Sequence, residues 1–157
     1  MATFINITNH PLSQWGEGQR KAAGFLNGVE GREILFPNVL PNASSEEIAN
    51  LARGIVSSVQ AIGEPASEDV GVWGVHVMGE QTLCFALVSE LLKLGYNVLA
   101  STTERRVVET PTGKISQFEF VKFRRYAVIP IPPKAVDAAS AANAWGGDGR
   151  REIPQRG

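Results

Sequence analysis

The chain has few of the residues that cross-link a fold or bind metals through sulfur. Its 157 residues include one cysteine, Cys84, and two histidines. A disulfide framework and a thiolate metal site are therefore excluded. No apolar run approaches the roughly 20 residues that a membrane span needs, and no signal peptide is visible. These absences predict a cytoplasmic protein without a membrane partner.

An excess of charge of either sign is also absent. The sequence has 15 Lys and Arg against 16 Asp and Glu, a formal net charge of −1. A non-specific duplex binder needs a broad basic surface, so we expect no duplex nucleic acid as a partner. A local basic pocket for a small anion is still compatible with this balance. At this length we expect one domain with a real hydrophobic core.

The segment 70–106 has the pattern of a β-α-β unit. Residues 70–78 are mostly apolar and β-branched, which is typical of a strand covered on both faces. Gly95 suits the left-handed end of the following helix, and residues 96–100 predict the next strand. The helix face consists of apolar side chains at positions i, i+3, i+4 and i+7, namely Cys84, Leu87, Val88 and Leu91.

Four further elements are predicted before this unit and a hairpin after it. Residues 3–8 predict a strand, residues 19–26 a short helix, and residues 33–36 a second strand. Ser44 and Glu47 form a capping box at the start of a helix that continues to residue 62. A turn at residues 110–113 joins two strands that end at residue 126.

This order predicts an α/β fold. We expect a Rossmann-like three-layer sandwich with a mainly parallel sheet, strand order 2-1-3-4 and a C-terminal β-hairpin. Residues 1–130 would form this domain. Residues 131–157 are a Pro/Ala/Gly-rich tail, in which residues 135–145 predict a short helix and residues 146–157 predict disorder.

Three polar segments follow strands of the predicted sheet, so we expect them to converge at its carboxyl edge. The first contains Asn9, His10, Ser13 and Trp15. His10 could be a general acid or base or a phosphate hydrogen-bond donor, or it could simply orient the loop. Trp15 could stack on a base or pack in the core. The other histidine, His76, lies inside an apolar strand and predicts a satisfied core residue.

The second segment, Gly79 to Thr82, opens a helix. Gly79 would allow close approach of a ligand, and Gln81 and Thr82 stand where free N–H groups suit a phosphate. Glu80 could be a base, a ribose hydroxyl acceptor or only a carboxylate at a helix N-terminus.

The third segment, residues 101–106, follows a predicted strand. Its arginine forks match phosphate oxygens bidentately. The alternative is an exposed hairpin base in which Glu and Arg side chains pair. The segment offers three hydroxyls, a carboxylate and two guanidinium groups, from Ser101, Thr102, Thr103, Glu104, Arg105 and Arg106.

Several of these motifs resemble a known family. A first strand that runs into the His10-Pro11 turn, the stretch from His76 to Glu80 and the run from Ser101 to Arg105 are similar to small stand-alone CRISPR-associated proteins. These are the compact CARF-like proteins of type III systems, which include the ring nucleases. The resemblance covers roughly residues 3–126.

This resemblance implies that the chain binds a cyclic oligoadenylate, for example cyclic tetra-adenylate, and cleaves it in antiviral defence. It implies a homodimer and no metal or other cofactor. His10, Glu80 and Arg105 would be catalytic. The ligand would touch the other residues of the three segments, namely Asn9, Ser13, Trp15, Gly79, Gln81, Thr82, Ser101, Thr102, Thr103, Glu104 and Arg106.

Two alternatives remain open on the sequence. The first is a sensor or sponge that binds the same ligand without cleaving it. The second is a Rossmann-like enzyme that acts on an ordinary nucleotide or nucleoside through a carboxylate such as Glu80. A nucleosidase would need a second acidic residue at the edge, and Glu104 is the one available.

Overall fold

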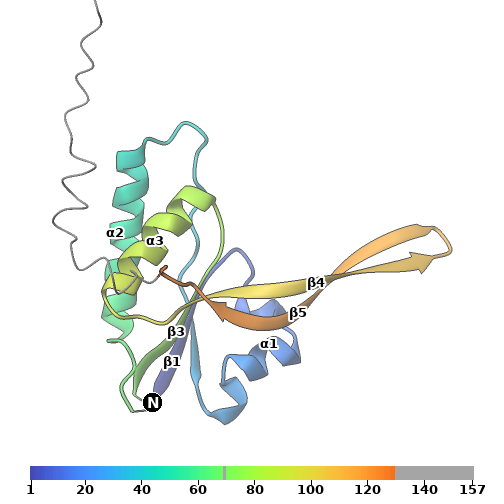
Figure 1. Cartoon of the computed structure of the whole chain (residues 1–157), viewed down its shortest axis with the longest axis horizontal. Coiled ribbons are helices and arrows are strands. Elements are labelled where there is room, and N and C mark those ends of the chain that lie inside the picture. The colour runs from blue at the N-terminus through green and yellow to red at the C-terminus, as the bar shows by residue number, and fades with distance from the viewer. Residues whose placement is uncertain (69, 130–157) are drawn as a thin grey trace, which may run out of the picture. The chain divides into compact units, whose positions relative to one another are not determined.

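The computed structural model describes residues 1–68 and 70–129 (Figure 1). The chain divides into two units, Met1–Tyr126 and Ala127–Gly157. The helix expected over residues 135–145 and the disorder expected over residues 146–157 lie outside the described residues. The following description concerns the first unit.

This unit is built on one five-stranded sheet of order β2-β1-β3-β4-β5. β1 pairs in parallel with β2 and β3, β3 pairs in parallel with β4, and β5 runs antiparallel to β4. The α/β class, the mainly parallel sheet, the order 2-1-3-4 and the C-terminal hairpin are therefore confirmed. The strands are β1 (Ala2–Ile7), β2 (Glu30–Glu33), β3 (Gly71–Val77), β4 (Val98–Thr110) and β5 (Gly113–Arg125).

Three α-helices connect the parallel strands. They are α1 (Glu17–Ala22), α2 (Ser45–Ile62) and α3 (Gln81–Lys93). Two 3-10 turns flank α1, at Leu12–Gln14 and Phe25–Asn27. The predicted capping box at the start of α2 is confirmed, because Ser44 and Glu47 each accept the other's backbone N–H. No helix among residues 1–68 and 70–129 is long and apolar enough to cross a membrane.

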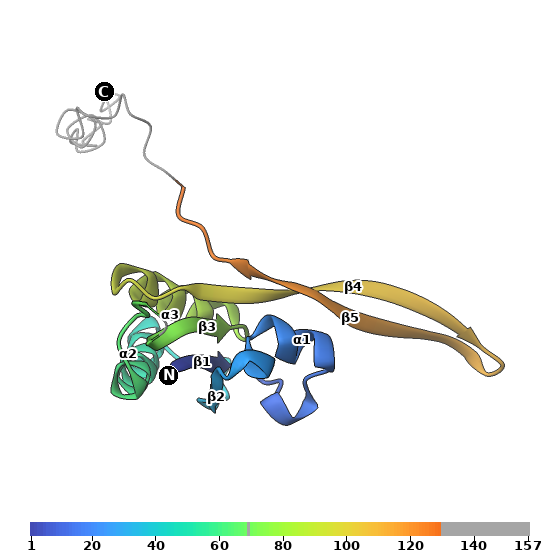
Figure 2. The same cartoon turned by 90° about the horizontal axis from the view of Figure 1, so that it is seen from below.

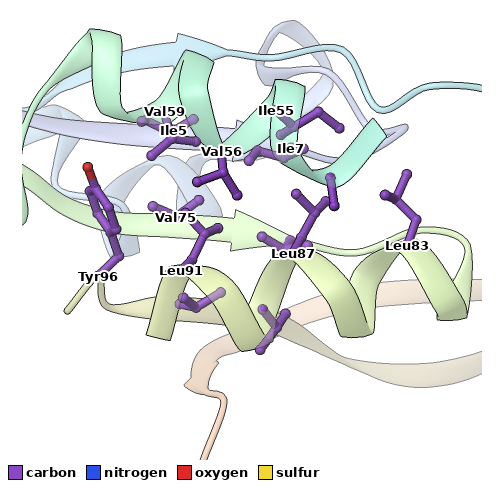
Figure 3. Packing of buried hydrophobic residues seen from close by; sticks show 14 of the residues in the cluster. Ile5, Ile7, Ile55, Val56, Val59, Val75, Leu83, Leu87, Leu91 and Tyr96 are labelled. Carbon is purple, nitrogen blue, oxygen red and sulfur yellow. The ribbon is translucent and has the colours of Figure 1, made fainter. Parts of the chain in front are cut away.

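The two faces of the sheet carry separate apolar clusters. On one face, Ile5, Ile7 and Val75 pack against buried side chains of α2 and α3 (Figure 3). On the other face, Phe4 and Leu99 pack against Trp15 and the α1 region. Successive strand residues alternate between the two faces, so helices cover both sides of the sheet.

The second strand differs from the prediction. It spans Glu30–Glu33 rather than residues 33–36. An edge strand needs few apolar side chains, and this one is mostly charged and exposed. The apolar residues that follow leave the sheet, and Phe36 packs into the core instead. The short helix also ends early, at Ala22, because the chain turns left-handed at Gly24 with φ +83°.

The hairpin is longer than predicted, and residues 101–106 lie inside it rather than after a strand end. β4 contacts β3 only through the pairs Val75–Val98 and His76–Leu99 and then continues to Thr110. Threonine and valine favour the extended backbone here, and no glycine or proline interrupts it before Pro111. Residues 103–121, beyond a bulge at Thr102/Thr103, form the arm, which reaches past the other strands (Figure 2).

Candidate functional site

The carboxyl ends of β1 and β3 lie side by side at the point where the strand order reverses. Ile7 pairs with Val77. After β1 the chain continues to β2, which lies on the other side of β1 from β3. β4 adds Ser101, whose N and Oγ lie 3.3 and 3.1 Å from Sδ of Met78. Residues 8–15, residues 78–80 and Ser101 together form what we call the polar edge. Ligands of open α/β sheets bind at such positions.

The backbone of His10 is held in place by buried side chains. Its carbonyl accepts hydrogen bonds from Nδ2 of Asn6 at 2.9 Å and from Nε1 of Trp15 at 3.1 Å. Its N–H donates to Oγ1 of Thr8 at 3.1 Å. Asn6 and Thr8 are both buried, whereas the His10 side chain is exposed. The loop therefore presents an imidazole to solvent from a fixed backbone.

His76 supports this network from the neighbouring strand. Its ring is 2% exposed, and Nδ1 lies 3.1 Å from Oδ1 of Asn6. An amide oxygen can only accept, so Nδ1 carries the proton. Nε2 has no hydrogen-bond partner in the described part of the chain. Burial, with a smaller contribution from His10, lowers the pKa of His76 to about 4, so the ring is neutral at neutral pH.

His76 was predicted to be a satisfied core residue. The structure satisfies one of its two nitrogens and surrounds the ring with aromatic side chains. The ring centroids of Phe123, Trp15 and Phe4 lie 5.2, 5.6 and 6.5 Å away. His76 thus fixes Asn6 and, through it, the His10 loop.

Glu80 is the N-cap of α3. Its carboxylate accepts hydrogen bonds from the backbone N–H groups of Thr82 and Leu83, at 3.1 and 2.8 Å, and from the Thr82 hydroxyl at 2.7 Å. These bonds, that of Leu83 first, lower the pKa of Glu80 and keep it ionised. Of the three roles considered for Glu80, the structure gives it that of a carboxylate at a helix N-terminus.

The same bonds correct the expectation of a phosphate site at the start of α3. The N–H groups of Thr82 and Leu83 already point to the Glu80 carboxylate, and the Thr82 hydroxyl donates to it as well. An anion would have to displace a carboxylate to reach them. Gln81 is exposed at the first position of the helix.

The arm carries the predicted arginines away from the polar edge of their own chain. Arg105 is four residues beyond Ser101, or roughly 13 Å along an extended strand. Its guanidinium donates to Oγ of Ser116 at 3.1 and 2.8 Å. Arg106 forms an ion pair of 3.1 Å with Glu119. The alternative of a hairpin in which Glu and Arg pair is realised for Arg106.

The remaining predicted residues fall into two groups. Thr102 donates to the carbonyl of Lys122 at 3.1 Å and so belongs to the hairpin. Thr103 and Glu104 are exposed on the arm. Asn9 and Ser13 are exposed beside His10, in the loop and in the 3-10 turn after it.

The chain belongs to the uncharacterized protein MJ1673 family. The family model matches residues 2–124. No curated protein matches the sequence. The matched range of this MJ1673-family chain begins in β1 and ends within β5, so it includes both the polar edge and the arm.

Two of the predicted ligand contacts are structural in this MJ1673-family protein. Trp15 is 5% exposed among Phe4, Phe25 and His76, so it packs in the core and cannot stack on a ligand. A Cβ at Gly79 would lie 2.5 Å from the Phe36 ring. Glycine is therefore required there by a neighbouring side chain rather than by a ligand.

The residues that hold the His10 loop were not predicted from the sequence. Asn6 lies in β1 and Thr8 directly follows it, and a polar residue between Ile5 and Ile7 was the available signal. Glu33 was missed as well. Its carboxylate accepts the backbone N–H of Leu12 from the end of β2, and no local pattern indicates this contact.

Proposed function

We propose that this MJ1673-family protein binds a cyclic oligoadenylate, most simply cyclic tetra-adenylate, at the polar edge of a Rossmann-like fold. We propose further that it cleaves this ligand as a ring nuclease of type III CRISPR defence in the cytoplasm. The observation that supports the proposal is the His10 loop. An exposed imidazole stands on a backbone fixed by Asn6, Thr8 and Trp15, at the switch point of the sheet.

The chemistry needs proton transfer and charge stabilisation. His10 takes the proton of a ribose 2′-hydroxyl, and the 2′-oxygen forms a bond to the adjacent phosphorus. The bond from phosphorus to the 5′-oxygen breaks, that oxygen takes a proton from water, and His10 releases to water the proton that it accepted. The product is linear, with a 2′,3′-cyclic phosphate and a 5′-hydroxyl. Ser101 donates a hydrogen bond to the phosphate as charge develops. Arg105 donates another, and because it lies roughly 13 Å beyond Ser101 along the arm, it comes from a second copy of the chain. These steps use no metal or cofactor.

A sponge that binds the same ligand without turnover is the second candidate. It is favoured by the Glu80 carboxylate, which accepts three hydrogen bonds in capping α3 and is therefore poorly placed to act as a second acid or base. An enzyme acting on an ordinary nucleoside has less support. Glu33 and Glu80, the carboxylates near the edge, both accept backbone N–H groups.

The first prediction is metal-independent cleavage that depends on His10. Purified protein is incubated with cyclic tri-, tetra- and hexa-adenylate, with and without EDTA, and the products are resolved by liquid chromatography and mass spectrometry. We expect linear products that end in 2′,3′-cyclic phosphate in both conditions. His10→Ala should reduce the rate by about 100-fold or more, the usual contribution of a general acid or base.

The matched control is Gln60→Ala, on the exposed side of α2, which should cleave at the wild-type rate. Intact ligand that co-purifies with the protein would establish the sponge. If none of the three rings is bound or cleaved, the cyclic oligoadenylate proposal is wrong.

A further inference from the structure

The arm exposes apolar side chains on both of its faces. Beyond Ser101, each arm strand pairs only with the other among the described residues, so both outer edges are open. The register places Phe118 and Val107 on one face with Arg105, and Val108 and Ile115 on the other. Exposed apolar area of this kind on a projecting element marks a protein interface. The side chains that are 42–68% exposed are Val107, Val108, Ile115, Phe118 and Val121.

The charges of the arm indicate what kind of partner covers it. Within residues 103–121 there are three cationic and three anionic side chains. Arg106 pairs with Glu119 and Lys114 with Glu109 inside the arm. A surface of balanced charge does not attract a polyanion or an anionic membrane. It suits another protein, and a balanced patch can be complementary to a second copy of itself.

The size of the arm favours a symmetric partner. Eight residues in each of two strands give one face of roughly 250–300 Å². A different protein bound to one face would bury about 550 Å² in total, which is the scale of a crystal contact. In a two-fold dimer each copy contributes its own arm and the surface under its partner's arm. The total is then about 1,100 Å², which passes the threshold of about 1,000 Å² for a specific interface.

The position of the arm sets how two copies meet. β4 continues past the polar edge, so the arm projects from the edge that carries His10 (Figure 2). If two copies meet with their polar edges facing each other, the arm of each copy must lie along the other copy. Arg105 lies on the same face as Phe118 and Val107, so contact through that face carries the guanidinium to the other copy.

We propose that the arm clasps a second copy of this chain and brings Arg105 to the polar edge of that copy, beside its His10. The part of the proposal in which the arm clasps a second copy rests on the exposed apolar side chains of the arm. The role of Arg105 rests on the proposed function, because it makes the guanidinium a phosphate donor for a ring shared by two chains. The site would then be complete only in the dimer.

Sedimentation equilibrium without ligand tests the clasp. The full chain should be a dimer, and a variant in which residues 104–119 are replaced by Asn-Gly should be a monomer at the same concentration. Phe118→Gln should weaken the dimer at least tenfold, and Leu35→Gln, at an even more exposed site outside the arm, should leave it unchanged. A monomeric full chain, or a shortened variant that dimerises equally well, overturns the proposal.

Mixing two variants tests the exchange of Arg105. His10→Ala and Arg105→Ala should each be defective alone. In a mixed dimer, one of the two edges receives His10 and Arg105 both intact, so the mixture should recover about a quarter of wild-type cleavage. If Arg105 serves its own chain, mixing recovers nothing. A clean dimer that neither binds nor cleaves cyclic oligoadenylates overturns the proposed function and leaves the clasp standing.

Discussion

At the scale of single residues, His76 has the environment with the clearest consequence for stability. Its pKa is about 4 in the folded chain and 6.5 ordinarily. Between these values the unfolded chain binds a proton that the folded chain does not. The free energy of unfolding should therefore fall as pH drops from 6.5 to 4, by about 3 kcal/mol in all, and should not change through this group above pH 6.5.

Urea unfolding across this pH window measures the effect. His76→Gln keeps an N–H to donate to Asn6 but cannot titrate, so its stability should lose most of this slope, whatever its absolute value. His10→Ala should retain the slope, because burial rather than His10 is the main cause of the shift. Equal slopes in wild type and His76→Gln would show that another group causes the pH dependence.

At the scale of elements, variants at the N-cap of α3 distinguish a capping role of Glu80 from a catalytic one. Glu80→Ala removes the acceptor of two backbone N–H groups and should lower Tm. Glu80→Ser keeps an N-cap oxygen without a carboxylate and should restore most of that loss. Cleavage by the two variants should be similar wherever both are folded. If Glu80→Ser had the wild-type Tm but a much lower cleavage rate, Glu80 would have a catalytic role.

Elements marked by local chemistry were predicted from the sequence, and elements set by long-range pairing were not. Ser44 and Glu47 define the start of α2 because the capping box is closed within four residues. The strand Glu30–Glu33 has no apolar pattern, and pairing with β1 alone makes it a strand. Threonine and valine in β4 favour an extended backbone, but how far the strand runs also depends on twelve cross-strand pairs with β5.

The same division applies to the candidate site. The position of His10 follows from the parallel order of the strands, which any β-α-β pattern implies. The placement of Arg105 could not be predicted, since it depends on whether the chain bends or stays extended after Ser101. Asn6 reaches His76 across 70 residues of sequence, and only the folded sheet shows this contact.

At the scale of the whole molecule, we propose separate tasks for the arm and for the body, which is the rest of residues 1–126. The body holds His10 rigidly at the polar edge. The arm is exposed, carries Arg105 and Arg106, and beyond Ser101 its strands pair only with each other among the described residues. A site built from both is complete only when the arm of one chain meets the body of another. Activity should then depend on protein concentration in a way that a self-contained monomer would not show.

Arg105→Ala tests this dependence. Above the dimer Kd, it should weaken binding of cyclic tetra-adenylate by about 1.5–3 kcal/mol, the range for a hydrogen bond to a charged group. Far below the dimer Kd, wild type should lose affinity to the same level, because no second arm is present. Titration calorimetry at high concentration and fluorescence titration at low concentration measure the two limits. Arg53→Ala, at an exposed arginine on α2 outside the arm, should match wild type in both. A difference between wild type and Arg105→Ala that persists at the lowest concentration would place the guanidinium in its own chain's site.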